Sequence, residues 1–339
     1  MVEQRCSVGV RKRALAFALG IVIASSANAE AEDQPTPIPA RNSNPYIAIF
    51  GLPTMESGVT LSEGKDHFAL LLDISNNSIR NTVADESITL DGESYRLSAI
   101  WRRGISPFFE IGMEVPYVTH SSGAFDNLIE DWHDMVGLTN NDRDDSPSNS
   151  LDYRYKQGDT TLAGFTTGNS GLGDIRLFAS KSLLTSYKRS LKISASLKLP
   201  TGKENYLHGS GDTDYSIYIS ANDSETFSHW NISGYGQLGV IKIGQKSDIQ
   251  DIRRDSALFG GLGFNWAFTQ TIDLKAQLQS HTPIYNNGID QMSHTSTLLA
   301  IGGAIRLSDT SRLDIGLVED LVTDSIPDVT INMAFSIYY

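Results

Sequence analysis

The last residues of the chain constrain its fold more than any other stretch. Residues 328–339 read DVTINMAFSIYY, and apolar side chains occupy every second position from Val329 to Tyr339. The positions between them carry Thr, Asn, Ala and Ser before Tyr338. Such strict alternation predicts a β-strand with one apolar face and one polar face. The chain is therefore expected to end in a strand that separates two different environments.

This final strand also ends on an aromatic residue. Phe335, Ile337 and Tyr339 share the apolar face, and such an ending resembles the C-terminal signal read by the outer-membrane assembly machinery. We take these three residues as a candidate assembly signal, which implies that machinery and outer-membrane lipids as partners. The alternative is an edge strand of a soluble sandwich, whose faces alternate in the same way.

The start of the chain predicts export. A basic region with Arg5 and Arg11 precedes an uncharged apolar run at 14–24, and Ala27-Asn28-Ala29 offers a cleavage site before Glu30. This order predicts a cleaved signal peptide over residues 1–29, with a retained helical anchor as the alternative. The single cysteine lies inside that segment, so no disulfide is expected to hold the exported protein together.

No segment after residue 29 predicts a membrane-spanning helix. A helical span needs about 20 predominantly apolar residues. The stretch that comes nearest to this, 256–272, is uncharged but contains polar residues and several glycines. A chain of this kind can span a bilayer only as a closed barrel, which satisfies every backbone group. The formal net charge of −13 disfavours nucleic acid as a partner.

The alternation of the last strand recurs along the chain. It predicts an all-β fold, a transmembrane antiparallel up-and-down β-barrel of about 12 strands over residues 67–339, with 10 or 14 strands as alternatives. A further hairpin at 151–166 would give the larger number. The predicted strands are 67–75, 93–103, 107–118, 173–182, 189–199, 214–221, 229–241, 256–268, 271–282, 296–307, 311–320 and 329–339.

The connections between these strands alternate between long and short. Outer-membrane barrels have short periplasmic turns and longer external loops, so both chain ends are expected in the periplasm of a Gram-negative bacterium. The longest external loop, 119–172, contains apolar residues at helical spacing between Phe125 and Val136, which predicts a short helix. Its acidic run at 140–145 lacks the glycine and glutamate of a calcium loop and indicates a solvated loop.

Charged residues within the predicted strands fall on one face only. A charge facing lipid costs about 2–4 kcal/mol at the bilayer midplane, so the charged face is expected to line the lumen. Mixed signs could pair and fill a narrow lumen, or form a mildly basic conduit for an anionic or polar solute. The candidates are Arg96, Arg102, Glu110, Glu114, Asp174, Arg176, Lys192, Lys198, Asp273, Lys275, Arg306, Arg312 and Asp314.

Residues 30–66 precede the first strand and contain too many prolines for a central strand. Ile47, Ile49, Phe50 and Leu52 nevertheless need burial, because an exposed apolar patch would lack a partner. We expect this segment to fold into the lumen as a plug near the periplasmic mouth, with Arg41 and Asn42 close enough to pair with Glu110 or Glu114. A loose periplasmic tail is the alternative.

The sequence predicts no catalytic residue, metal site or cofactor. Adjacent Ser and His pairs occur, among them those at 120–121, 228–229 and 293–294. Neighbouring residues in a strand point to opposite faces, so such pairs make poor catalytic partners, and no G-x-S-x-G motif is present. Solvated histidines in turns are the preferred interpretation.

Several segments together resemble one family. They are RNSNPYIAIFGLP at 41–53, FDNLIEDWHDMVGL at 125–138, LDYRY at 151–155, GLGDIRL at 171–177 and LKLPTG at 197–202. The chain resembles the uncharacterised outer-membrane family known as domain of unknown function 3187. The GLGD and LPTG motifs are also similar, more loosely, to barrels linked to phenol and aromatic degradation. The resemblance implies a barrel and supplies neither catalytic residue nor substrate.

These observations predict a passive channel or binding barrel for a small solute. One alternative is a lipid-acting barrel enzyme, which would need a Ser and a His that converge on the outward rim. Another is a structural barrel without flux, which a fully packed lumen would favour.

Overall fold

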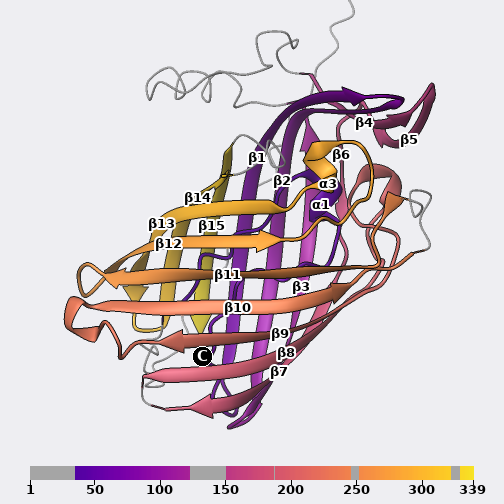
Figure 1. Ribbon diagram of the computed structural model, residues 1–339. Helices are drawn as coiled ribbons and strands as arrows, with labels where there is room; N and C mark the ends of the chain where they lie inside the picture. Colours follow the sequence, from indigo (N-terminus) through magenta and orange to yellow (C-terminus); the bar gives the residue numbers. More distant parts are fainter. Residues whose placement is uncertain (1–34, 123–149, 187, 246–251, 322–328) are drawn as a thin grey trace, which may run out of the picture.

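The computed structural model describes residues 35–122, 150–186, 188–245, 252–321 and 329–339. The predicted signal peptide and the predicted helix after Phe125 lie outside these residues. No helix among the described residues has the length and apolar character needed to cross a membrane. The fold consists of antiparallel strands around a tilted, closed wall (Figure 1).

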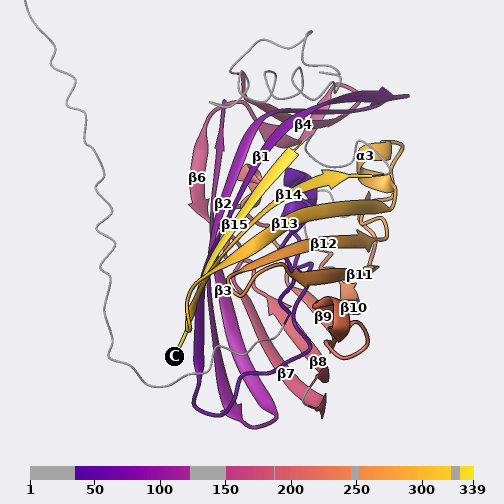
Figure 2. The same cartoon turned by 90° about the vertical axis from the view of Figure 1, so that its left-hand side faces the viewer.

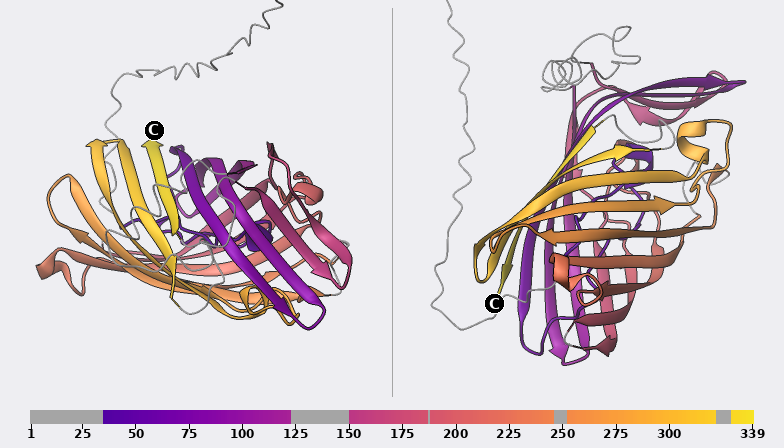
Figure 3. Two further views of the ribbon diagram at one scale, coloured as in Figure 1. Left: turned by 90° about the horizontal axis from the view of Figure 1, so that it is seen from above. Right: turned by 60° about the vertical axis from the view of Figure 1, so that its left-hand side comes forward.

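Twelve strands form the closed wall. β1 pairs with both β2 and β15, and β3 pairs with β2 and β7, so the first and last strands meet and complete the ring. Figure 3 shows the last strand beside the first from above. The strands are β1 (Asp66–Val83), β2 (Glu86–Ser106), β3 (Phe109–Ser121), β7 (Arg176–Thr185), β8 (Arg189–Lys198), β9 (Asp214–Asp223), β10 (Ile232–Lys242), β11 (Ser256–Ala267), β12 (Ile272–His281), β13 (Ser296–Ser308), β14 (Ser311–Asp320) and β15 (Val329–Tyr338). This confirms the predicted twelve-strand barrel.

The two ends of the barrel differ. Short turns, together with the start of β1 and the C-terminus, lie at one end, which we call the short-turn end. The long connections, including the short helix α3 (Asp290–Ser293), lie at the opposite end, the long-loop end (Figure 2). The turn after β9 shows how the sequence closes a short turn. The Asp223 carboxylate accepts hydrogen bonds of 2.8 Å from the backbone amides of Glu225 and Thr226.

The alternation in the sequence becomes an inner and an outer face. On β12, Leu274 and Leu278 point outward with about two-fifths of their surface exposed, whereas Lys275 and Gln277 are buried inside. Exposed aromatic side chains gather at the short-turn end, including Phe109, Trp230, Trp266, Phe268 and Tyr339. An outer apolar belt with aromatic residues at its border is what a strand wall presents to a bilayer.

The first hairpin is longer than the sequence analysis predicted. Residues 76–92 were expected to form a loop, but β1 continues to Val83 and β2 begins at Glu86, in unbroken register. β4 (Asp152–Gln157) pairs with this extension and with β5 (Thr160–Phe165). The hairpin expected at 151–166 therefore exists, but it lies beyond the wall and adds no strand to the ring. A further strand, β6 (Asn169–Leu172), pairs with the end of β3.

Candidate functional site

Residues 35–62, here called the luminal segment, run through the inside of the barrel. They rise along β12 and β15, where the side chains of Gln277 and Asn332 donate hydrogen bonds of 3.1 and 3.3 Å to the carbonyls of Ile38 and Pro39. The segment turns at the short helix α1 (Pro45–Ala48) near the long-loop end. It returns along β9 and β3, and the Leu61 amide donates 2.9 Å to Glu110 before β1 begins.

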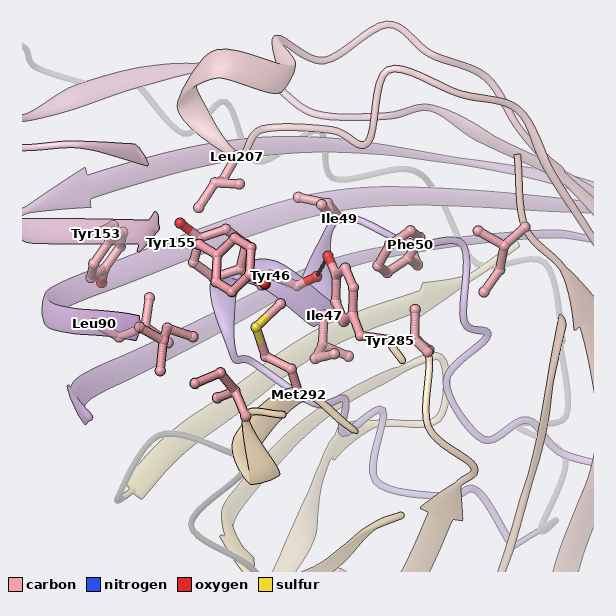
Figure 4. Packing of buried hydrophobic residues seen from close by; sticks show 14 of the residues in the cluster. Tyr46, Ile47, Ile49, Phe50, Leu90, Tyr153, Tyr155, Leu207, Tyr285 and Met292 are labelled. Atoms are coloured by element: carbon pink, nitrogen blue, oxygen red, sulfur yellow. Dashed lines mark hydrogen bonds between the residues drawn. The ribbon is translucent and has the colours of Figure 1, made fainter. Parts of the chain in front are cut away.

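The apolar residues of the segment lie at the long-loop end. Ile47, Ile49 and Phe50 are buried, Leu52 is partly buried, and they pack with side chains from β4, the loop around η2 (Glu204–Tyr206) and the β12–β13 connection (Figure 4). We call this group the mouth cluster; its other members include Tyr46, Tyr153, Tyr155, Leu207, Tyr285 and Met292. The sequence predicted these apolar residues near the periplasmic mouth, where the chain enters the barrel, and that placement was wrong.

Polar bonds fix the mouth cluster around the tip of the segment. The Tyr285 hydroxyl donates 2.8 Å to the Tyr46 carbonyl, and the Tyr46 hydroxyl donates 3.1 Å to the Ala163 carbonyl on β5. The Phe50 ring meets the Tyr285 ring edge-on at 5.7 Å and lies 5.3 Å from the Arg253 guanidinium carbon. Three separate connections at the long-loop end thus contact one turn of the luminal segment.

Lower in the lumen, the segment meets the wall through charged groups. Arg41 lies 3.1 Å from both Asp73 and Glu114. Glu56 lies 2.8 Å from Arg102 and 3.1 Å from Lys192. Burial removes the water that would otherwise solvate these charges. A buried carboxylate such as Glu56 therefore needs several protein partners at once.

The part of the luminal segment that follows α1 also contacts the wall through its backbone. The Gly51 amide donates 2.9 Å to Asp214, and the Gly58 amide donates 3.0 Å to Asn222. A Cβ atom added at Gly58 would lie 2.8 Å from the Ala221 Cα, closer than real Cβ contacts. The contact with β9 therefore requires glycine at this position.

The predicted lumen-lining charges all have the parity of the inner face. Glu110, Glu114, Asp174, Arg176, Lys192, Lys198, Lys275 and Asp314 are buried, and Arg96, Arg102 and Arg312 keep less than a fifth of their side chains exposed. Asp273 and Arg306, near the short turns, are half-buried. Opposite charges pair, as Arg176 on β7 does with Glu114 on β3 at 3.0 Å, and Lys198 on β8 with Asp174, just before β7, at 2.7 Å.

Sequence reasoning missed several polar contacts of the lumen. Asp73, on β1, pairs with Arg41, and its parity was hard to assign because its inward neighbours Ala69 and Leu71 are apolar. Glu56 lies in a segment without alternation. The expected partner of Asn42 was also wrong, because its side chain bonds to His281 and Ser296 at 3.2 Å.

The structure also brings together a Ser and a His that are distant in sequence. Ser94 Oγ lies 2.8 Å from His120 Nδ1 and 3.1 Å from the Tyr153 hydroxyl. Ser94 and His120 are buried on the inner side, against Tyr153 of β4, and not on the outward rim that a lipid-acting enzyme would use. The His120 ring stacks at 5.8 Å on His208, whose pKa is lowered from its ordinary value by burial and by nearby Lys203.

The described residues contain no group of three or more His, Cys, Asp or Glu side chains placed to hold a metal ion. A closed strand wall with an apolar outer belt and a charged inner face defines the class of transmembrane β-barrels. The chain belongs to the family described as "Protein of unknown function (DUF3187)", whose family model matches residues 14–339. This confirms the resemblance seen in the sequence.

Solved structures of similar fold are outer-membrane channels and porins. An outer membrane channel from Pseudomonas putida F1 superposes with a TM-score of 0.54 and 13% identity, over 83% of this chain and 97% of that one. The Ralstonia pickettii toluene transporter TbuX gives a TM-score of 0.40 and 10% identity, over 82% and 90%. No curated protein matches the sequence. The first likeness shows the barrel fold and nothing finer.

Proposed function

We propose that the protein is a gated passive channel for a small solute in the outer membrane, and that the luminal segment closes it at rest. The outer apolar belt and aromatic border support a membrane position, with the short-turn end in the periplasm and the long-loop end outside. The luminal segment supports the gate, because it passes from one end of the barrel towards the other inside the wall.

The polar contacts between the luminal segment and the barrel wall are the main support for the gate. Between the mouth cluster and the short-turn end, the segment is held by hydrogen bonds and ion pairs, such as those of Arg41 and Glu56, and by packing of Ile38 and Ala40 on the wall. A hydrogen bond to a charged group contributes about 1.5–3 kcal/mol net, because water solvates the same groups when the bond is released. These polar contacts can exchange for water at moderate cost, whereas release of the tip of the segment also requires separation of the apolar mouth cluster.

A structural barrel without flux is the second candidate. The same filled lumen favours it, because the segment and the paired charges leave little open space. The two functions differ in whether the segment ever moves. A lipid-acting enzyme has less support, because Ser94 and His120 lie on the inner side.

A reversible tether separates these functions. The single cysteine, Cys6, lies in the predicted signal peptide, so introduced pairs are free of competitors. A Cβ built at Gly51 lies 3.4 Å from the Asp214 Cβ, close to the 3.5–4.5 Å range of a disulfide. We expect Gly51→Cys with Asp214→Cys to conduct in planar bilayers only after reduction. Asp214→Cys alone controls for the loss of the hydrogen bond from the Gly51 amide and of the ion pair with Lys198, and Gly51→Cys alone controls for the added side chain.

Deletion of residues 36–58 provides the complementary test. A gated channel predicts a clear rise in conductance from the deleted protein, measured on barrels with normal heat-modifiable gel mobility. Unchanged conductance in a correctly folded deleted barrel would rule out the gate and favour the structural barrel. Equal conductance of the oxidised and reduced tethered protein would show that the segment does not move during conduction.

A further inference from the structure

The luminal segment leaves one substantial cavity against the wall. It has a volume of about 160 Å³ and lies between the segment and β1, β2, β14 and β15, in the half of the barrel nearer the short turns. Its lining combines wall residues such as Leu71, Ile100 and Arg312 with segment residues such as Met55 and Leu61. The cavity is thus bounded by both the wall and the gate.

Small side chains in the wall create this cavity. One row of inward positions across the four strands reads Ile100, Ala69, Ser336 and Arg312, in direct register. The next row reads Ser98, Leu71, Ala334 and Asp314. Ala69, Ala334 and Ser336 leave a recess at the centre, where β1 meets β15. Leu71 and Ile100 make part of its surface apolar, which is unusual for a lumen otherwise lined by charges.

The other side of the recess carries unused hydrogen-bond donors. Arg312 reaches Asp314 through Nε at 2.9 Å, and none of its hydrogen bonds among the described residues uses a terminal guanidinium nitrogen. Arg102, in contrast, already lies near both Glu56 and Glu110. His67 stacks on Tyr338 at 4.5 Å, and its Nε2 is buried with no hydrogen-bond partner in the described part of the chain.

We propose that this recess binds one small carboxylate with a compact apolar body. The terminal nitrogens of Arg312 suit a carboxylate, because a guanidinium donates two parallel hydrogen bonds to its two oxygens. His67 Nε2 supplies a further donor beside it. The apolar body then lies against Leu71 and Ile100. An engineered cavity of about 150 Å³ takes up benzene, so a ligand the size of one six-membered ring fits here.

This site extends the proposed function, because it names the chemical class of the solute. Only the transport of that solute rests on the proposed channel function; its binding does not. Binding is measured without flux, so the two can fail separately. Saturable binding with no conductance would support the site and contradict the channel function, so that the protein would be a binding barrel. Conductance without saturable binding would support the channel function and contradict this binding site.

The test uses the full folded chain in detergent micelles, with benzoate as the probe and titration calorimetry as the readout. We expect one site per chain. Benzyl alcohol, of similar size but uncharged, should bind about tenfold more weakly, because it lacks the charge-assisted hydrogen bonds to Arg312. 2-Naphthoate should bind more weakly as well, because its second ring exceeds the cavity.

Substitutions locate the site. Arg312→Gln should weaken benzoate binding by about tenfold, as loss of a hydrogen bond to a charged group does. Ala334→Leu should abolish binding by filling the recess. Arg189→Gln, at an exposed pair with Asp223, is the matched control and should change nothing. The proposal is overturned by equal binding in Arg312→Gln and the control, by benzyl alcohol binding as tightly as benzoate, or by no saturable binding to the folded wild type.

Discussion

Arg41 Nη2 lies 3.1 Å from Glu114 Oε1, so a residue of the luminal segment completes an ion-pair network of the barrel wall. Glu114 keeps Arg176 and Arg96 as partners if Arg41 is lost. We therefore expect Arg41→Gln to release the segment without unfolding the wall. Loss of hydrogen bonds to charged groups costs about 1.5–3 kcal/mol.

A change of that size should raise the open fraction in planar bilayers about tenfold to a hundredfold. Arg80→Gln, which removes an exposed pair with Asp91 outside the ring, serves as the control. An Arg41→Gln channel as quiet as the control would mean that this ion pair does not hold the gate.

The mouth cluster gives a second prediction. Phe50→Ala removes a buried ring that packs on Tyr285, and a Phe to Ala change in a core costs about 3–5 kcal/mol. We expect faster hydrogen exchange at the backbone amides of residues 47–51, read by mass spectrometry. Phe227→Ala removes an exposed ring at the short-turn end and should leave these amides protected. Unchanged exchange in Phe50→Ala would contradict the role of the cluster as an anchor.

The outer face gives a third prediction. Leu274 points outward on β12, with 41% of its surface exposed. Leu274→Arg should destabilise the barrel by about 2–4 kcal/mol, because it places a charge in lipid. The free energy of unfolding is measured by urea titration in lipid vesicles, with Leu274→Met as the control. Equal stability of the two variants would show that this face does not contact lipid.

The C-terminus gives a fourth prediction. Phe335 lies on the outer face of β15 and Tyr339 directly follows this strand, and both side chains are exposed to an assembly factor. Deletion of Tyr339, or Phe335→Asp, should sharply reduce the yield of barrel in outer-membrane fractions and leave the chain in the periplasm. Tyr338→Phe, on the inner face, should assemble normally. Normal yield and heat-modifiable mobility after deletion of Tyr339 would remove the assembly-signal hypothesis.

The strand wall was predictable because one physical rule acts at every position of it. Lipid excludes charge from one face, so the parity of Lys275 and Asp314 revealed the inner side. The extension of β1 and β2 was not predictable in this way. Its residues lie beyond the wall, where both faces tolerate polar groups, and the stretch around Asn76 and Gly92 therefore reads as a loop.

The contacts inside the lumen depend on the path of a segment without periodicity. Burial of Ile47 and Phe50 followed from their apolar character, but their position did not. The mouth cluster joins Tyr46 to Tyr155 and Tyr285, which are far apart in sequence, and no local pattern indicates such a meeting. Gln277 illustrates the same limit. Its parity predicts a tolerant wet position, yet it is buried and bonded to Ile38.

The seam between β1 and β15 has a consequence for the order of folding. The luminal segment is joined directly to β1, whereas β15 is made after every other strand of the wall. The hydrogen bond from Asn332 to Pro39 spans 293 positions of sequence, and contacts of such separation form late because loop closure opposes them. We expect the wall to close around a segment already inside it, so that docking and closure are one event. With cysteines introduced at positions 39 and 332, the time at which they first form a disulfide during refolding can be measured. That time is compared with the time at which the neighbouring hairpins form.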